Sequence, residues 1–478
     1  MDSAYEATIG LEIHAELKTL TKMFCDSKND PDELSPNVNV CPICLAHPGT
    51  LPVINKEAVG HVLRVGIALG STLADYTEFD RKNYFYPDLP KGYQISQFEF
   101  PLVSGGKLNG VAITRIHLEE DTASSIHDEN SGATLIDYNR SGVPLMELVT
   151  EPVIKSPEEA GAFARELQLL LRTLGVSEAN MEKGQMRVEA NVSVAKKGLR
   201  SAAYVEIKNL NSFRAMERAV AYEIKRQEGM IERGEPLIKQ TLGWDENKQA
   251  TFPQRTKEGS ADYRYFPDPD LPSLKLSEFA EYAPEALFLN MPELPSERRK
   301  RYLGLGIKPD DAELYIRDPQ LGGFFEDVIS AYTGESLKVQ LASNYIANDL
   351  VNIIRDNIRR DSSYSHEIPI SVRNFNTIID LVSNSKISSR TAKDILSECV
   401  LTGTDPETIA REKQLFQISS GADLEIIVKE VISKNPTVAA DFKAGKATAL
   451  EYLLGQTMKA TRGAADPTAL RGLLRKNL

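Results

Sequence analysis

The sequence predicts an α+β protein, in which a sheet-rich N-terminal part is followed by a helical C-terminal part. Short stretches of alternating apolar and polar residues, typical of half-buried strands, are interspersed with helical stretches up to about residue 290. Beyond that point the strand patterns fade, and Pro292, Pro295 and Pro309 mark a transition to helical spacing. A chain of 478 residues is also too long for one ordinary core. The predicted domains are residues 1–292, 293–404 and 405–478.

The first predicted strand, over residues 5–17, carries three ionisable groups at alternate positions. These are Glu12, His14 and Glu16, separated by apolar residues. Side chains alternate between the two faces of a strand, so all three point the same way. We interpret this face as the lining of a cleft; the alternative is an edge that faces solvent.

Helices are predicted at several points along the chain. The first has apolar helical spacing from Val59 and stops at Gly70. A capping box at Ser156, with proline at the first helical position, starts the second, and the third follows Ser212. Apolar spacing continues in the middle domain, for example over residues 375–382.

Residues 136–150 contain an unusual concentration of polar side chains, among them Asp137, Asn139, Arg140 and Glu147. Buried polar groups cost free energy unless they are paired. The cluster therefore predicts a site that binds ions or charged groups.

A second acidic segment lies at residues 115–121 and predicts a metal site together with the first strand. Carboxylates with few nitrogens suit Mg²⁺, and the alternative is a set of surface salt bridges. The sequence has no Walker A motif and no Gly-x-Ser-x-Gly elbow, so any ATP site lies outside those families. The candidate groups are Glu12, His14, Glu119, Glu120 and Glu147.

Two further segments, residues 81–97 and 257–272, combine prolines, aromatic rings and basic side chains. Proline-restricted loops hold side chains rigidly around a ligand, and aromatic rings beside cations stack on bases. The alternative is an ordered structural loop.

The cysteines suggest a partial zinc site. Cys41 and Cys44 form a C-x₂-C pair, and Cys25 precedes it. The candidate fourth ligands are His47, Asp26 and Ser27, of which His47 is chemically the best. The alternative is a set of reduced core thiols, as we expect for Cys399.

Net charge and hydropathy limit the classes of protein to which this chain can belong. A net charge of −12 argues against a general nucleic-acid binder, yet residues 441–478 hold seven basic and three acidic residues. That segment predicts a local nucleic-acid contact, or else a solvated helical face. The acidic N-terminus and the lack of a long apolar run favour a cytoplasmic protein.

Six segments, in order along the chain, resemble the family formed by the B subunit of aspartyl/glutamyl-tRNA amidotransferase, and the tail resembles YqeY-like proteins. The resemblance implies a cradle domain on a mostly antiparallel sheet with flanking helices, an all-α middle domain and a small all-α YqeY-like tail. The segments are residues 9–14, 80–88, 117–121, 137–150, 206–213 and 262–267.

The resemblance also implies a function: ATP-dependent amidation of Glu-tRNA(Gln) or Asp-tRNA(Asn). In that family an amidase, the A subunit, would release ammonia from glutamine, and a small C subunit would wrap the pair. The B subunit would bind ATP and the aminoacylated tRNA, and phosphorylate the side-chain carboxylate, with Mg²⁺ neutralising the phosphate. Two rival hypotheses are a non-catalytic tRNA-binding scaffold and a free-standing metallohydrolase.

Residue by residue, the resemblance assigns Mg²⁺ to His14, Glu119 and Glu147, with Glu12 and Glu120 beside them. Arg140 and Lys82 are implied phosphate or carboxylate partners. Two departures from the family pattern affect the cysteine and acidic positions: Ser27 stands where many members have a second cysteine, and Glu189 where they often have aspartate. The candidate tRNA contacts in the tail are Lys459, Arg462 and Arg471.

Overall fold

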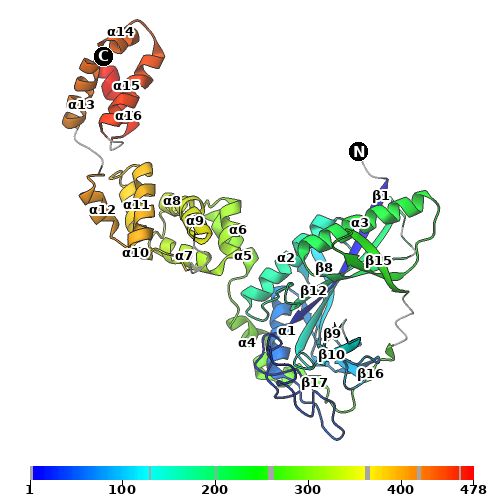
Figure 1. The fold of residues 1–478 in the computed structure, drawn as a ribbon. Helices are drawn as coiled ribbons and strands as arrows, with labels where there is room; N and C mark the ends of the chain where they lie inside the picture. Colours follow the sequence, from blue (N-terminus) through cyan, green and yellow to red (C-terminus); the bar gives the residue numbers. More distant parts are fainter. Residues whose placement is uncertain are drawn as a thin grey trace. The chain divides into compact units, whose positions relative to one another are not determined.

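The computed structural model describes residues 4–128, 131–199, 201, 203–256, 263–360, 367–416, 421–461 and 465–478. The chain forms two compact units, Met1–Pro295 and Ser296–Leu478. The first contains the sheets and the second is helical, which confirms the predicted α+β class (Figure 1).

One large sheet of ten strands forms the frame of the first unit. Nine strands lie in the order β15-β14-β13-β12-β1-β11-β8-β6-β2, and β7 pairs with β8. Among the described strands only β13 and β14 pair in parallel, so the sheet is mostly antiparallel, as expected. The strands are β1 (Tyr5–Glu16), β2 (Thr72–Leu73), β6 (Val103–Ser104), β7 (Lys107–Leu108), β8 (Val111–Glu120), β11 (Pro144–Thr150), β12 (Met186–Lys196), β13 (Val205–Leu210), β14 (Gln240–Asp245) and β15 (Ala250–Thr256).

Three helices cover one side of this sheet: α1 (Lys56–Ala68), α2 (Pro157–Thr173) and α3 (Phe213–Glu232) (Figure 1). Their apolar faces pack on the inward residues of the strands and form one continuous core. The predicted cap at Ser156 is confirmed, because Ser156 Oγ accepts the Glu159 N–H at 3.1 Å. A helix follows Ser212 as predicted, and Ser212 caps α3 in the same way.

The register of the strands sorts the other residues onto the opposite, polar face. His14 on β1 pairs with Glu147 on β11 and with Arg187 on β12, while Glu12 pairs with Glu189. Glu147 in turn pairs with His117 on β8. Cross-strand partners lie on the same face, so residues from four strands form one charged surface.

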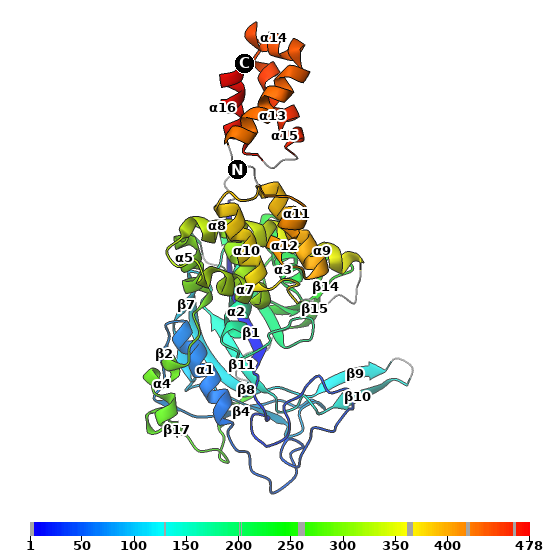
Figure 2. The ribbon, with the colours of Figure 1, turned by 90° about the vertical axis from the view of Figure 1, so that its left-hand side faces the viewer.

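Smaller sheets complete the first unit, and one of them stands against this polar face. A three-stranded sheet joins β4 (Asp80–Asn83) to β5 (Tyr93–Ser96) and β16 (Phe266–Pro267), and so places the two aromatic-rich segments side by side. The hairpin of β9 (Ser124–Asp128) and β10 (Ala133–Asp137) projects from the unit in Figure 2. The remaining elements are β3 (Tyr76–Thr77), β17 (Leu274–Lys275), η2 (Leu276–Glu278), η3 (Ala280–Tyr282) and α4 (Pro284–Leu289).

The second unit is helical throughout its described residues. Helix α12 packs against α10 and α11, while α13 to α16 share a separate apolar core. The predicted domain limits at residues 292 and 404 stay predictions. The helices are α5 (Pro295–Gly304), α6 (Pro309–Arg317), α7 (Pro319–Ser330), α8 (Ser336–Asn344), η4 (Tyr345–Leu350), α9 (Val351–Arg360), α10 (Val372–Ser383), α11 (Ser389–Thr402), α12 (Pro406–Glu412), α13 (Gly421–Lys434), α14 (Pro436–Lys443), α15 (Ala447–Ala460) and α16 (Pro467–Asn477).

None of the helices within the described ranges combines the length and the apolar character that a membrane crossing requires.

Candidate active site

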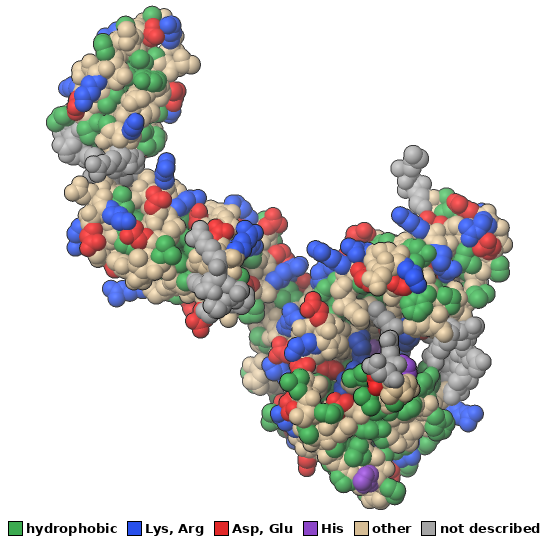
Figure 3. Space-filling view, viewed as in Figure 1, with side chains coloured by type: hydrophobic (Ala, Val, Ile, Leu, Met, Phe, Trp, Pro, Cys, Tyr) green, Lys and Arg blue, Asp and Glu red, His purple; other side chains and the backbone are tan. Residues whose placement is uncertain are grey.

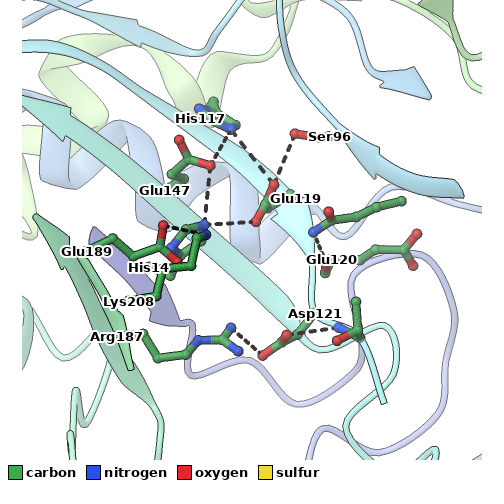
Figure 4. Close-up of polar contacts among 12 residues, drawn as sticks. His14, Ser96, His117, Glu119, Glu120, Asp121, Glu147, Arg187, Glu189 and Lys208 are labelled. Carbon is green, nitrogen blue, oxygen red and sulfur yellow. Dashed lines mark hydrogen bonds and ion pairs between the residues drawn. The ribbon is translucent and has the colours of Figure 1, made fainter. Parts of the chain in front are cut away.

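The centre of the polar face is a group of three side chains, His14, Glu119 and Glu147, from β1, β8 and β11, which we call the metal-type group (Figure 4). His14 Nε2 lies 3.3 Å from Glu119 Oε1 and 3.3 Å from Glu147 Oε2. The three candidate ligand atoms all lie within 4.8 Å of one another, and both carboxylates are buried. The structure thus brings together the three positions that the family resemblance implied for a metal.

Charge balance in this group depends on nearby cations. Burial opposes the ionisation of Glu119, but Lys82 and His14 outweigh it and lower the pKa of this carboxyl. Burial likewise opposes ionisation of Glu147, while His117 and His14 hold its pKa well below the usual value. Both carboxyl groups are therefore anionic at neutral pH.

The two imidazoles on this face differ in protonation. Burial alone would lower the pKa of His14, but hydrogen bonds to Glu119 and Glu147 raise it to about 10. For His117, burial prevails and lowers the pKa. At neutral pH His14 is charged and His117 is neutral, so His14 neutralises part of the negative charge of the two carboxylates.

The donor set fits a divalent cation. Two carboxylates and one imidazole offer hard ligands, and a hard ion such as Mg²⁺ takes its remaining ligands from water or phosphate. Binding would displace the His14 proton, because imidazole must be neutral to ligate a metal. His117 lines the cavity, and its Nδ1 is buried without a hydrogen-bond partner among the described residues. Such an atom is typical of a site that a ligand or water completes.

A second acidic group lies beside the first and contains Glu12, Glu189 and Glu206. Lys208 Nζ is 2.7 Å from Glu189 Oε2 and 3.8 Å from Glu206 Oε1. Burial and the charge of Glu147 raise the pKa of Glu12. Sequence reasoning missed Glu206 and Lys208; the signal that could have found them is their alternate spacing on one strand, which places them on one face.

The wall opposite the sheet is aromatic and basic. Lys82 Nζ lies 5.4 Å from the centre of the Tyr263 ring, and Phe98 stacks on Tyr265 with ring centres 4.4 Å apart. Together with the polar face, this wall encloses a cavity of about 1370 Å³. The two aromatic-rich segments therefore line a cavity, as one of the two interpretations predicted; residues 257–262 lie outside the described residues.

Two residues of the polar cluster at 136–150 are structural, contrary to our expectation of a shared binding site. Asp137 Oδ1 accepts the Asn37 N–H at 2.9 Å, and Asn139 Oδ1 accepts the Asn39 N–H at 2.9 Å. Both side chains therefore hold the loop that precedes Cys41 in place through hydrogen bonds. Of Asp137, Asn139, Arg140 and Glu147, only Glu147 belongs to the metal-type group.

Glu120 and Arg140, two of the expected catalytic residues, do not line the cavity. Glu120 follows Glu119 on β8 and so points to the other face, where it accepts hydrogen bonds from Lys91 Nζ and from the Ile95 N–H. Arg140 Nε donates to the Thr122 carbonyl at 3.0 Å. The geometry gives both residues a supporting position instead of a catalytic one.

The thiol cluster of Cys25, Cys41 and Cys44 also assembles, with all three sulfur atoms within 4.8 Å of one another. His47 is not part of it among the described residues. Lys22 Nζ lies 3.9 Å from Cys44 Sγ and supplies a buried positive charge. A hydrogen bond from Cys25, helped by Lys22, lowers the pKa of Cys44 to about 4. Three of the four ligands of a structural zinc are present.

Two further expectations concern Cys399 and the basic residues of the tail. Cys399 is buried in α11, as predicted for a core thiol. In the tail, Arg471 pairs with Glu451 at 3.1 Å, whereas Lys459 on α15 is exposed. Arg462 lies outside the described residues. The face of the tail in Figure 3 carries both basic and acidic side chains.

Comparison with known families first defines a class. The family model described as the GatB/GatE catalytic domain matches residues 7–280, and the model described as the GatB domain matches residues 324–478. The sheet with its metal-type group thus lies within the catalytic domain of this class, and the helical unit contains the second match.

Relatives at high identity specify the family further. This chain is 44% identical to the B subunit of the aspartyl/glutamyl-tRNA(Asn/Gln) amidotransferase from Thermus thermophilus, over 98% of both chains. It is 44% identical to the protein of that name from Thermomicrobium roseum and 41% identical to the one from Carboxydothermus hydrogenoformans, in each case over 99% of both chains. The chain belongs to the family of aspartyl/glutamyl-tRNA(Asn/Gln) amidotransferase B subunits.

Proposed function

We propose that this chain carries out the ATP-dependent amidation of Glu-tRNA(Gln), Asp-tRNA(Asn) or both, as the B subunit in a complex with the amidase and the small C subunit. The observation that supports this most directly is the convergence of His14, Glu119 and Glu147 in a cavity whose opposite wall carries Lys82. A charged floor facing a basic, aromatic wall suits a nucleotide and an aminoacyl group together.

The proposed chemistry solves a reactivity problem. A carboxylate is a poor electrophile, so its oxygen must first become part of a leaving group. ATP with Mg²⁺ would supply the phosphoryl group and neutralise its charge. Ammonia from the amidase would then displace phosphate from the acyl phosphate and leave the amide.

Several cavity residues have a proposed role in these reaction steps. His14, Glu119 and Glu147 hold the Mg²⁺, and Lys82 binds a phosphate oxygen from the opposite wall. Burial raises the pKa of Glu12, which suits it to take up the proton that ammonia loses as the amide forms. Glu120 and Arg140 position the neighbouring strands and loop through their hydrogen bonds.

Further proposals concern the tail, the thiol cluster and the compartment. Lys459, which is exposed, contacts tRNA together with Arg462, and Arg471 contributes less because Glu451 neutralises it. The thiol cluster binds Zn²⁺ with a fourth ligand from outside the three cysteines. An enzyme of translation that uses charged tRNA works in the cytoplasm.

A reconstituted complex tests the proposal against the scaffold hypothesis. Glu147→Ala should abolish ATP- and Mg²⁺-dependent amide formation while tRNA binding stays within about twofold, because the change is confined to the metal-type group. Glu182→Ala, an exposed change in the same unit, is the matched control and should retain activity. Amidation at the normal rate by Glu147→Ala would favour the scaffold, and activity of the lone chain without tRNA would favour a metallohydrolase.

A further inference from the structure

Arg187 is a cavity residue to which neither the metal-type group nor the second acidic group gives a role. It lies on β12 directly opposite His14, and its side chain faces the cavity with 37% of its surface exposed (Figure 4). Both Arg187 and His14 line the same cavity. A group bound to Arg187 therefore shares that cavity with anything bound at His14.

A buried carboxylate fixes the guanidinium in place. Arg187 Nη2 lies 2.7 Å from Asp121 Oδ2, and Asp121 also accepts the Thr122 N–H at 2.8 Å. Arg140 Nε, at 3.7 Å from the same oxygen, steadies Asp121 from the other side. The pair with Asp121 holds one edge of a planar group that has five N–H donors, so several donors remain for a ligand.

Two other cations of the sheet face contact the two acidic groups themselves. Lys208 Nζ lies 2.7 Å from Glu189 and 3.8 Å from Glu206, and Arg115 Nη2 lies 3.7 Å from Glu147 Oε1, whereas Arg187 pairs with Asp121, outside both groups. A guanidinium also matches a carboxylate better than an ammonium does, because two parallel N–H bonds meet its two oxygens. Arg187 is thus the residue of the sheet face best suited to bind a carboxylate.

We propose that Arg187 binds the side-chain carboxylate of the aminoacyl-tRNA and holds it beside the metal-type group for phosphorylation. This inference rests on the proposed function, and it makes Arg187 a substrate-binding residue. Asp121 and Arg140 are positioning residues that act through it. Holding the two reacting groups next to each other converts their encounter into a step within one complex.

Kinetics of the co-expressed complex test this assignment. Arg187→Gln should lower kcat/KM for Glu-tRNA or Asp-tRNA by about 10- to 100-fold, as expected for the loss of a charge-assisted hydrogen bond. Arg187→Lys keeps the charge and should recover part of the loss. KM for ATP and Kd for uncharged tRNA should stay within about twofold. Lys196→Gln removes an exposed cation from the same strand and serves as the matched control.

A measurement on the unaltered complex covers the case in which a variant misfolds. Charged Glu-tRNA(Gln) should bind about tenfold more tightly than Gln-tRNA(Gln), which lacks the carboxylate. Equal affinities for the two charged tRNAs would overturn the inference. So would an Arg187→Gln variant in which only KM for ATP rises, because Arg187 would then bind a phosphate of ATP. A wild-type complex that forms no amide would instead refute the proposed function itself.

Discussion

His14 is predicted to stay protonated far above neutral pH in the ion-free protein. Its pKa rises from 6.5 to about 10, against the effect of burial, because Glu119 and Glu147 lie 3.3 Å from Nε2. At about 1.4 kcal/mol per pKa unit, that rise corresponds to at most about 5 kcal/mol of folding free energy. Removing the imidazolium takes away one of the cations that offset these two buried anions.

The sign of the pH dependence follows from the direction of the pKa change. A group with a raised folded-state pKa stabilises the protein fully below its unfolded pKa of about 6.5, and this stabilisation is lost as pH rises toward 10. We expect His14→Gln to cost about 2 to 5 kcal/mol at pH 6 and little near pH 10. Burial lowers the pKa of His117, so the contribution of His117 has the opposite sign and is lost as pH falls below about 6.5.

Two measurements with a chelator present check this prediction. NMR titration of ¹³C-labelled histidines should show one imidazole, absent from His14→Gln, that does not titrate below pH 9. Urea unfolding should show the difference between wild type and variant shrinking from pH 6 to pH 9, with His117→Gln as the contrasting control. Titration of His14 near pH 6.5, or a constant difference over that range, would refute the reasoning. Added Mg²⁺ should lower the apparent pKa of His14, because the ion competes with the proton.

Three further predictions concern the helical unit, the tail and the thiol cluster. In α7, Gly322→Ala places a Cβ 2.3 Å from the Tyr315 carbonyl oxygen, whereas Gly323→Ala meets nothing within 4 Å. Thermal unfolding should therefore show a loss of about 1 to 3 kcal/mol for the first and a gain of about 0.5 to 1 kcal/mol for the second; similar effects would contradict this packing. Lys459→Gln should reduce the salt slope of tRNA binding by about one, and Arg471→Gln by less; a slope unaffected by Lys459→Gln would remove the tail contact. Metal analysis should find about one zinc per chain in the thiol cluster, and three freely titrating thiols without zinc would exclude it.

Local sequence patterns predicted a large part of the architecture. The cap at Ser156 was confirmed because a cap depends on neighbours three residues away. The alternation in β1 correctly placed Glu12 and His14 on one face, since the period of a strand is intrinsic to its backbone. The meeting of His14 with Glu119 and Glu147 was predicted by resemblance to a family, not by spacing.

The tertiary structure decided which polar residues share the cavity. Glu119 and Glu120 are adjacent in sequence, yet only Glu119 faces His14, because the strand turns successive side chains to opposite sides. Asp137 was expected in the site but binds the loop before Cys41.

What the sequence determined by itself is the identity of many elements and, in β1, the face that Glu12 and His14 share. Only the tertiary structure joined Arg187 to Asp121 and Lys208 to Glu189. The physical reason is that the charge of a neighbour decides the role of an ionisable group. In the metal-type group Glu119 and Glu147 lie more than a hundred residues from His14 in the sequence, and the pairing of their strands depends on the whole sheet.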